Sequence, residues 1–282
     1  MGRTILMDGA AGTTLWEIAE KHGAKKDPVW IYNIEHPEFV RELHDRYIAA
    51  GSEIIQANTF GANGPSVKRS SSYETADVVR AAVRIAKEAV EASGKDVKVA
   101  LSVGPLSQLM EPYGDLEEEE VEEIYDEMFA AGVPEGADYI IIETFFDLAM
   151  MAVAARTAKK YGLPVLCSMT FEKVGKTMMG NSVQDVIDEL TAVGVDGIGM
   201  NCSLGPETAL AIIREFAEKT DLPIFYKPNA GLPISSAGGT DAVPYTPESF
   251  AKEVAPAVEF VSYLGGCCGT NDEFVKELKK LL

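Results

Sequence analysis

Short apolar segments alternate with amphipathic segments along the whole chain, and this alternation restricts the fold more than any other feature of the sequence. Apolar runs of roughly four to eight residues are typical of buried strands, whereas apolar residues about three and four positions apart are typical of helices. Eight segments have the strand pattern, and they are residues 4–7, 53–57, 97–103, 139–142, 165–170, 197–201, 224–227 and 260–264. A strand that alternates with a helix in this way predicts a parallel sheet covered by helices.

Helical patterns fill the intervals and follow the last strand, at residues 37–50, 73–93, 117–132, 147–161, 182–193, 206–219, 247–255 and 271–282. Eight strand–helix units in 282 residues fit a closed (β/α)8 TIM barrel, a fold that typically uses about 250 residues. We therefore predict an α/β protein with a single barrel domain, residues 1–282. A doubly wound open sheet is the alternative. Residues 231–244 are expected to form a long loop after the seventh strand, without a domain boundary.

Charge and composition exclude several classes of protein. The chain has 25 Lys and Arg residues against 44 Asp and Glu residues, and the resulting net charge of −19 repels nucleic acids and anionic membrane surfaces. No apolar run approaches the roughly 18 residues that a membrane span needs, and no hydrophobic leader follows Met1. A cytoplasmic protein is therefore expected. The acidic run at residues 117–120 is expected to lie on the solvated face of a helix.

Polar residues gather at the positions where the predicted strands end. In a barrel of this type the catalytic groups lie where strands end and the following loops begin. The polar residues at these positions are Asp8, Asn58, Ser102, Glu143, Asn201, Cys202, Asn229, Cys267 and Cys268. We therefore predict an active site at the C-terminal ends of the strands. His22, His36 and His44 follow no strand, so we expect them on the surface or in loops and predict no histidine general base.

Three cysteines provide the most specific chemical signal. Cys267 and Cys268 lie in a glycine-rich loop whose backbone can bend so that both sulfurs face one point. By themselves they could equally form a vicinal disulfide or remain two loop thiols. Cys202 ends the sixth strand, two strands away around the barrel, so its sulfur can point into the same mouth; its alternative role is that of a buried, inert thiol. Cys167, inside an apolar strand, is expected only to pack.

Three thiolates around one point suit Zn²⁺, which is tetrahedral and would keep a fourth position open for a substrate. A substrate thiol at that position would lose its proton, and alkylation of the resulting sulfur is the natural reaction. Asp8 precedes a run of small residues whose N–H groups could receive a carboxylate, although it could simply cap the turn. Glu143 follows a wholly apolar strand and needs either a structural hydrogen-bond partner or a ligand cation such as an ammonium group. Together these groups predict a thiol amino acid as substrate.

Several motifs also resemble those of a known family. They are Asp8-Gly9-Ala10-Ala11-Gly12-Thr13, Asn58-Thr59-Phe60-Gly61-Ala62, Glu143-Thr144-Phe145, Asn201-Cys202-Ser203-Leu204-Gly205-Pro206, Pro228-Asn229-Ala230-Gly231 and Gly265-Gly266-Cys267-Cys268-Gly269-Thr270. Over nearly its whole length the chain is similar to the homocysteine S-methyltransferase family, and most similar to the N-terminal homocysteine-binding zinc barrels of cobalamin-dependent methionine synthases.

The resemblance implies that homocysteine is the substrate and that its sulfur takes the fourth position on zinc. It implies that Cys202, Cys267 and Cys268 hold the metal. It also implies roles for five further residues: Asp8 and Glu143 meet the amino group, the amides of Gly9 and Ala10 lie near the carboxylate, and Asn229 supplies an oxygen ligand to zinc in the absence of substrate.

The methyl donor does not follow from the residues. The relatives continue into folate-binding and cobalamin-binding modules, whereas this sequence ends at Leu282, so the expected donor is methylcobamide on a separate corrinoid protein. Alternative donors are a small sulfonium such as S-methylmethionine or a folate. The acceptor could also be a different thiol or selenol, or the chain could be a catalytically silent subunit that binds homocysteine or zinc. A redox sensor built on Cys267 and Cys268 is a further alternative.

Overall fold

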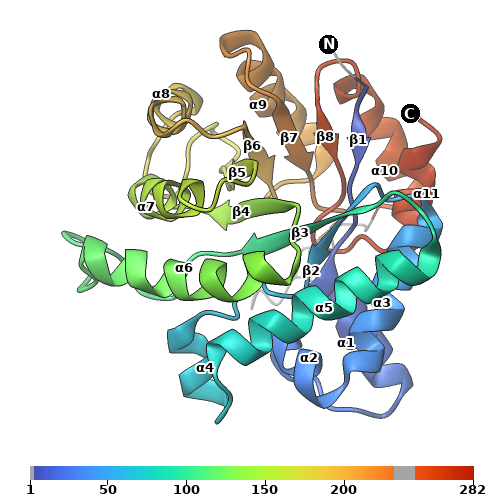
Figure 1. Cartoon of the computed structure of the whole chain (residues 1–282). Helices are drawn as coiled ribbons and strands as arrows, with labels where there is room; N and C mark the ends of the chain where they lie inside the picture. Colours follow the sequence, from blue (N-terminus) through green and yellow to red (C-terminus); the bar gives the residue numbers. More distant parts are fainter. Residues whose placement is uncertain (1–2, 232–244) are drawn as a thin grey trace, which may run out of the picture.

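The computed structural model describes residues 3–231 and 245–282, and these residues form one eight-stranded parallel sheet (Figure 1). The strands are β1 (Ile5–Leu6), β2 (Ile54–Ala57), β3 (Lys98–Val103), β4 (Tyr139–Phe145), β5 (Val165–Met169), β6 (Gly197–Asn201), β7 (Ile224–Lys227) and β8 (Tyr263–Leu264). Their order around the sheet is β1-β8-β7-β6-β5-β4-β3-β2. A parallel bridge between Met7 and Ile54 joins the two end strands, so the sheet closes and the predicted (β/α)8 barrel is confirmed.

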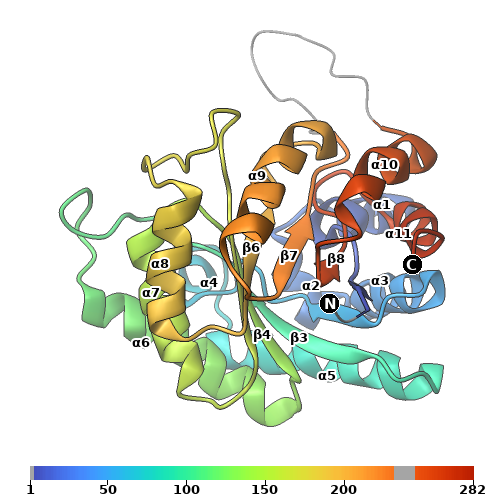
Figure 2. The same ribbon diagram turned by 90° about the horizontal axis from the view of Figure 1, so that it is seen from above.

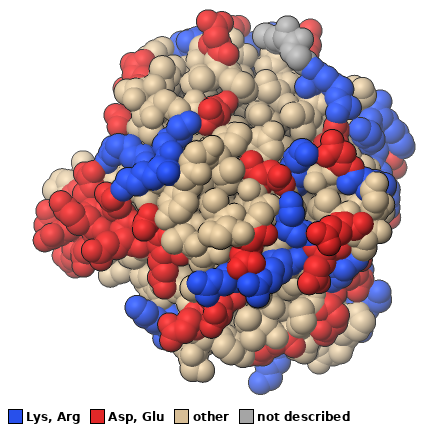
Figure 3. Space-filling view, in the orientation of Figure 1, with Lys and Arg blue, Asp and Glu red and all other residues tan. Residues whose placement is uncertain are grey.

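Helices surround the barrel on its outer side (Figures 1 and 2). The eight predicted helices are present as α3 (Pro37–Ala50), α5 (Thr75–Ser93), α6 (Glu118–Gly132), α7 (Leu148–Lys159), α8 (Val183–Val193), α9 (Pro206–Lys219), α10 (Pro247–Val254) and α11 (Asp272–Lys279). Acidic side chains gather around the N-terminal end of α6, at the left of Figure 3, and residues 117–120 are exposed as predicted.

Several shorter elements are present that the sequence pattern did not predict. They are α1 (Ala11–Lys21), α2 (Tyr32–Glu35), α4 (Gly64–Ser70) and the 3-10 turns η1 (Val29–Ile31), η2 (Val133–Glu135) and η3 (Ala255–Ala257). α1 begins without a side-chain cap, because Ala10 stands at the position where Ser, Thr, Asp or Asn would signal a start. Except for Gly231, the predicted loop at 231–244 lies outside the described residues.

The interior of the barrel is filled by apolar side chains. Met7, Ile54, Ala100, Ile141, Leu166 and Phe225 form a cluster that is completely buried, and Ile5, Tyr139 and Tyr263 pack against it. A barrel filled in this way has no pore, so a ligand can reach only the loops at its ends. In the described part of the chain, no helix is long and apolar enough to cross a membrane.

His44, on α3, is completely buried, and neither ring nitrogen has a hydrogen-bond partner among the described residues. The prediction that all three histidines lie on the surface or in loops is therefore wrong for His44. Burial disfavours the charged imidazolium and lowers the pKa of His44 from 6.5 to about 3.

This shift predicts a measurable pH dependence of stability. Between pH 6.5 and about 3, the unfolded chain binds a proton at residue 44 that the folded chain does not bind. The free energy of unfolding should therefore decrease as the pH falls, with a slope from this group of up to about 1.4 kcal/mol per pH unit. In urea titrations from pH 7 to pH 5, the His44→Leu variant should lose this part of the slope.

A constant difference between His44→Leu and wild type over this pH range would show that His44 does not titrate on unfolding.

Candidate active site

A cavity of about 270 Å³ opens at the C-terminal ends of the strands. The loops after β1, β2, β6 and β8 contribute to its wall, and β2, β3, β4 and β7 contribute residues at or near their C-terminal ends. The lining residues that carry functional groups include Asp8, Gln56, Ser102, Glu143, Cys202, Lys227, Cys267 and Cys268. Most of the predicted site residues therefore share one space of a size suited to a small molecule.

The sulfurs of Cys202, Cys267 and Cys268 lie within 4.8 Å of one another, and those of Cys202 and Cys268 are 3.6 Å apart. In a tetrahedral zinc site with Zn–S bonds of about 2.3 Å, neighbouring sulfurs are roughly 3.8 Å apart. The cluster has the donor type and spacing that this metal requires. Hydrogen bonds from the thiols of Cys267 and Cys268 lower the pKa of Cys202, which favours the thiolate form that a metal binds.

Local backbone geometry brings these sulfurs together. Cys202 and Ser203 have φ angles of 56° and 53°, a left-handed conformation that is unfavourable for residues with a side chain. This bend turns the chain sharply at the end of β6. In the loop after β8, the N–H of Cys267 donates to the carbonyl of Pro228 at 2.9 Å, which ties this loop to the loop after β7.

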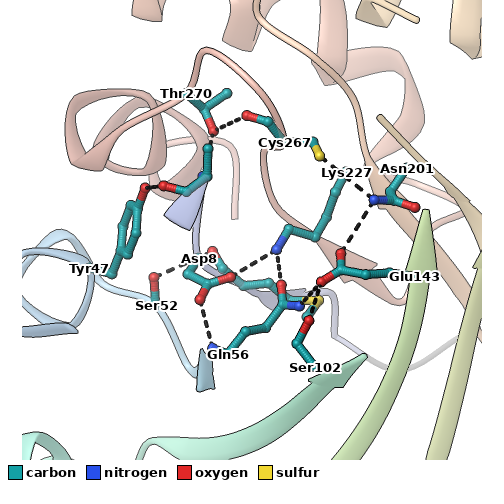
Figure 4. A network of polar contacts seen from close by, with 12 residues as sticks. Asp8, Tyr47, Ser52, Gln56, Ser102, Glu143, Asn201, Lys227, Cys267 and Thr270 are labelled. Atoms are coloured by element: carbon teal, nitrogen blue, oxygen red, sulfur yellow. Dashed lines mark hydrogen bonds and ion pairs between the residues drawn. The ribbon is translucent and has the colours of Figure 1, made fainter. Parts of the chain in front are cut away.

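Asp8 and Lys227 form a buried ion pair that the sequence analysis missed (Figure 4). Lys227, the last residue of β7, is 3% exposed, and its Nζ lies 2.8 Å from Asp8 Oδ1 and also donates to Gln56 Oε1. The other carboxylate oxygen of Asp8 accepts the backbone N–H of Gln56 at 2.7 Å. The ammonium partner that was expected from a substrate is thus supplied to Asp8 by the protein. A lysine at the end of an apolar strand was a signal for this pair, because a lysine is almost never buried unpaired.

Glu143, on β4, lies on the other side of this network (Figure 4). Its Oε1 accepts hydrogen bonds from Ser102 Oγ at 2.6 Å and from Gln56 Nε2. Its Oε2 has only a longer contact, 3.3 Å from Asn201 Nδ2. Burial raises the pKa of Glu143, although Lys227 and the hydrogen bonds oppose that shift. Oε1 of Glu143 therefore has two close hydrogen-bond donors from the protein, whereas Oε2 can still accept a hydrogen bond from a ligand.

The backbone amides predicted to receive a carboxylate differ in availability. The N–H of Ala10 donates to Thr270 Oγ1 at 3.1 Å, so this predicted donor has a partner within the protein. The N–H of Gly9 has no acceptor among the described residues. The first turn of α1 adds further free N–H groups, because no side chain caps that helix. Gly9 to Thr13 all line the cavity.

Asn229 lies just after β7 and is 2% exposed, and its side-chain amide has no hydrogen-bond partner among the described residues. It nevertheless lies near enough to Cys202 to help lower the pKa of that thiol. A buried amide without a partner is unfavourable by about 1 to 3 kcal/mol, so a ligand for it is expected.

Asn58 has a different role, because its amide donates to Asn33 Oδ1 and to the Val29 carbonyl and so joins neighbouring loops.

Comparison with known proteins agrees with this site. The family model described as homocysteine S-methyltransferase matches residues 5–282. The chain is 30% identical to the methionine synthase of Mycobacterium leprae and 29% identical to that of Mycobacterium tuberculosis, in each case over 98% of this chain and 24% of the relative. It thus spans about a quarter of the length of these relatives.

Solved structures share the fold. The homocysteine methyltransferase MmuM from Escherichia coli superposes in its apo form with a TM-score of 0.77 at 22% identity, over 100% of this chain and 97% of that one. Its metallated form superposes with a TM-score of 0.81 at 23% identity, over 99% and 96% of the two chains. The family model, which covers nearly the whole chain, decides the assignment: this chain belongs to the homocysteine S-methyltransferase family.

Proposed function

We propose that the chain binds Zn²⁺ through Cys202, Cys267 and Cys268 and transfers a methyl group to the thiol of homocysteine, forming methionine. The observation that carries the proposal is the convergence of three sulfurs within 4.8 Å inside the cavity that also holds Glu143. Family membership supports homocysteine as the substrate. On this proposal residues 1–282 form one homocysteine-binding domain, and the free thiols fit a reducing, cytoplasmic location.

The donor set supports zinc in particular. Thiolates select zinc over magnesium or calcium, and three protein ligands leave one position for a substrate. The bound metal would hold the substrate sulfur as a thiolate at neutral pH. The amide of Asn229 lies beside Cys202 and has no hydrogen-bond partner within residues 3–231 and 245–282, which supports its proposed role as an oxygen ligand in the absence of substrate. A metallated form of the relative MmuM also supports a metal here.

The rest of the cavity supplies partners for the amino acid end of homocysteine. We assign the ammonium group chiefly to Glu143 Oε2, since Oε1 is saturated by Ser102 and Gln56. Asp8 lines the same cavity and adds negative charge near the ammonium group, although Lys227 already pairs with it. The carboxylate is assigned to the N–H of Gly9 and to the first turn of α1, where the helix dipole also favours an anion.

In the transfer step the sulfur of homocysteine attacks the donor methyl carbon, and the bond from that carbon to the donor breaks with its electron pair leaving on the donor. The chain contributes proximity and orientation, which fix the sulfur in line with the incoming methyl group. We infer that the donor is methylcobamide on a separate corrinoid protein. The similarity to methionine synthases over 98% of the chain supports this choice over S-methylmethionine.

Each cluster cysteine should be necessary for metal binding. Replacement of Cys202, Cys267 or Cys268 by serine removes a thiolate ligand, so the purified protein should lose zinc and methyl transfer together. Metal analysis and methionine formation measure both. Cys167→Ala is the matched control, because Cys167 is buried in β5 and does not belong to the cluster. Normal zinc content and turnover in Cys202→Ser would refute the metal assignment.

Glu143→Gln should weaken homocysteine binding at least about tenfold while zinc is retained, because a charge-assisted hydrogen bond contributes roughly 1.5 to 3 kcal/mol. Calorimetry with the zinc-loaded protein measures the dissociation constant. The matched ligand is 4-mercaptobutanoate, which has the thiol and carboxylate of homocysteine without the amino group, and its affinity should be unchanged. An equal loss for both ligands would remove the proposed contact to the amino group.

A panel of donors tests the remaining part of the proposal. The zinc-loaded chain with homocysteine should form methionine from methylcobalamin. Turnover from S-methylmethionine alone would replace the proposed donor. Tight binding of zinc and homocysteine without turnover from any donor would instead identify a binding subunit, and methylation of another thiol or a selenol in preference to homocysteine would change the acceptor.

A further inference from the structure

We propose that Asn201, the last residue of β6, is a positioning residue that couples the cysteine cluster to Glu143 and thereby sets the length of amino acid that the site accepts. The proposal rests on the proposed function for the roles of zinc and homocysteine. Asn201 is completely buried and lies between the two groups, as Figure 4 shows. It neither lines the cavity nor touches a substrate in this assignment.

The orientation of the Asn201 amide is fixed by its neighbours. Its Oδ1 accepts the backbone N–H of Thr144 at 2.8 Å and the hydroxyl of Ser168 at 2.8 Å. A backbone N–H can only donate, so the atom facing Thr144 must be the amide oxygen. The amide nitrogen is therefore turned toward the cavity side, where it can act only as a donor.

The two hydrogens on Asn201 Nδ2 face three acceptors. Thr144 Oγ1 lies at 2.8 Å and takes one of them. The other hydrogen lies between Glu143 Oε2 at 3.3 Å and the sulfur of Cys267 at 3.7 Å. A single N–H group thus bridges the carboxylate that is assigned to the substrate ammonium and a sulfur that is assigned to the metal.

Left-handed backbone conformations lie directly beside Glu143 and directly beside Asn201. The non-glycine residues with left-handed φ in the described ranges are Thr144, Cys202 and Ser203. One follows Glu143 directly and the other two follow Asn201. Such conformations persist only where surrounding contacts hold them. Asn201 bonds Thr144 at both its N–H and its hydroxyl, so it fixes the turn that aims Glu143.

This arrangement has a consequence for specificity. An amino acid that binds Glu143 with its ammonium group and the metal with its sulfur must match the separation between the two. Homocysteine has one methylene group more than cysteine between these ends. If Asn201 keeps the distance between Glu143 and the metal constant, cysteine is too short to make both contacts. Replacing Asn201 should then reduce the preference for homocysteine over cysteine.

The test uses the full chain with the Asn201→Ala and Asn201→Asp substitutions. Asn201→Asp keeps an oxygen for Thr144 and Ser168 and removes the N–H donors, so it serves if the alanine variant fails to fold. Zinc affinity is measured by competition with a chelating dye, and homocysteine and cysteine affinities by calorimetry. We expect zinc affinity to fall about 10- to 100-fold, as is usual when a partner of a metal ligand is removed.

We also expect the preference for homocysteine over cysteine to fall in both variants, which a general loss of stability would not produce. The matched control is Ser168→Ala, which removes one contact to Oδ1 and leaves the shared N–H in place, so the preference should remain. Combining Asn201→Ala with Glu143→Gln should give less than the sum of the two effects on homocysteine affinity, because both act on one contact.

The outcomes separate the two proposals. A wild-type chain that binds neither zinc nor homocysteine overturns the proposed function and this inference together. A wild-type chain that binds both, with variants that keep its zinc affinity and its preference, overturns only the role of Asn201.

Discussion

The ion pair between Lys227 and Asp8 is the interaction on which the organisation of the cavity depends. Both side chains are almost completely buried, and each charge would be strongly unfavourable without the other. Lysine can only donate, so Gln56 must present its oxygen to Lys227 and its nitrogen to Glu143. The orientation of the Gln56 amide therefore follows from one ammonium group, and Gln56 Nε2 together with Ser102 Oγ occupies Oε1 of Glu143.

The closed barrel explains why this network can exist. Asp8 follows β1, whereas Gln56, Glu143 and Lys227 lie on β2, β4 and β7. β1 and β2 become neighbours only when the sheet closes, and closure turns the C-terminal ends of all these strands toward one mouth. The filled interior below them excludes water from that side. In such surroundings hydrogen bonds and charges interact more strongly than in water, so a small number of polar groups can orient a ligand.

The sequence predicted the eight strands and eight major helices well, because apolar periodicity reports directly which face of an element is buried. It predicted the cysteine cluster because strand ends in a barrel face one mouth. It did not predict Lys227 and Gln56 as partners of Asp8, because that requires the side-chain register of three strands. Nor could it predict that Thr270, far along the chain, occupies the N–H of Ala10. α1 has no capping residue to announce it, and the burial of His44 depends on packing around α3.

The filled interior of the barrel also bears on the order in which substrate and methyl donor bind. Met7, Ile54 and Phe225 are among the buried side chains that fill the barrel beneath the cavity. In the described part of the chain, the cavity is therefore open only at the C-terminal ends of the strands. A carrier protein that binds over this opening would close it. On the proposed function, the amino acid would then have to bind before the carrier protein, and the methylated product would leave only after the carrier has dissociated, so binding and release would be ordered.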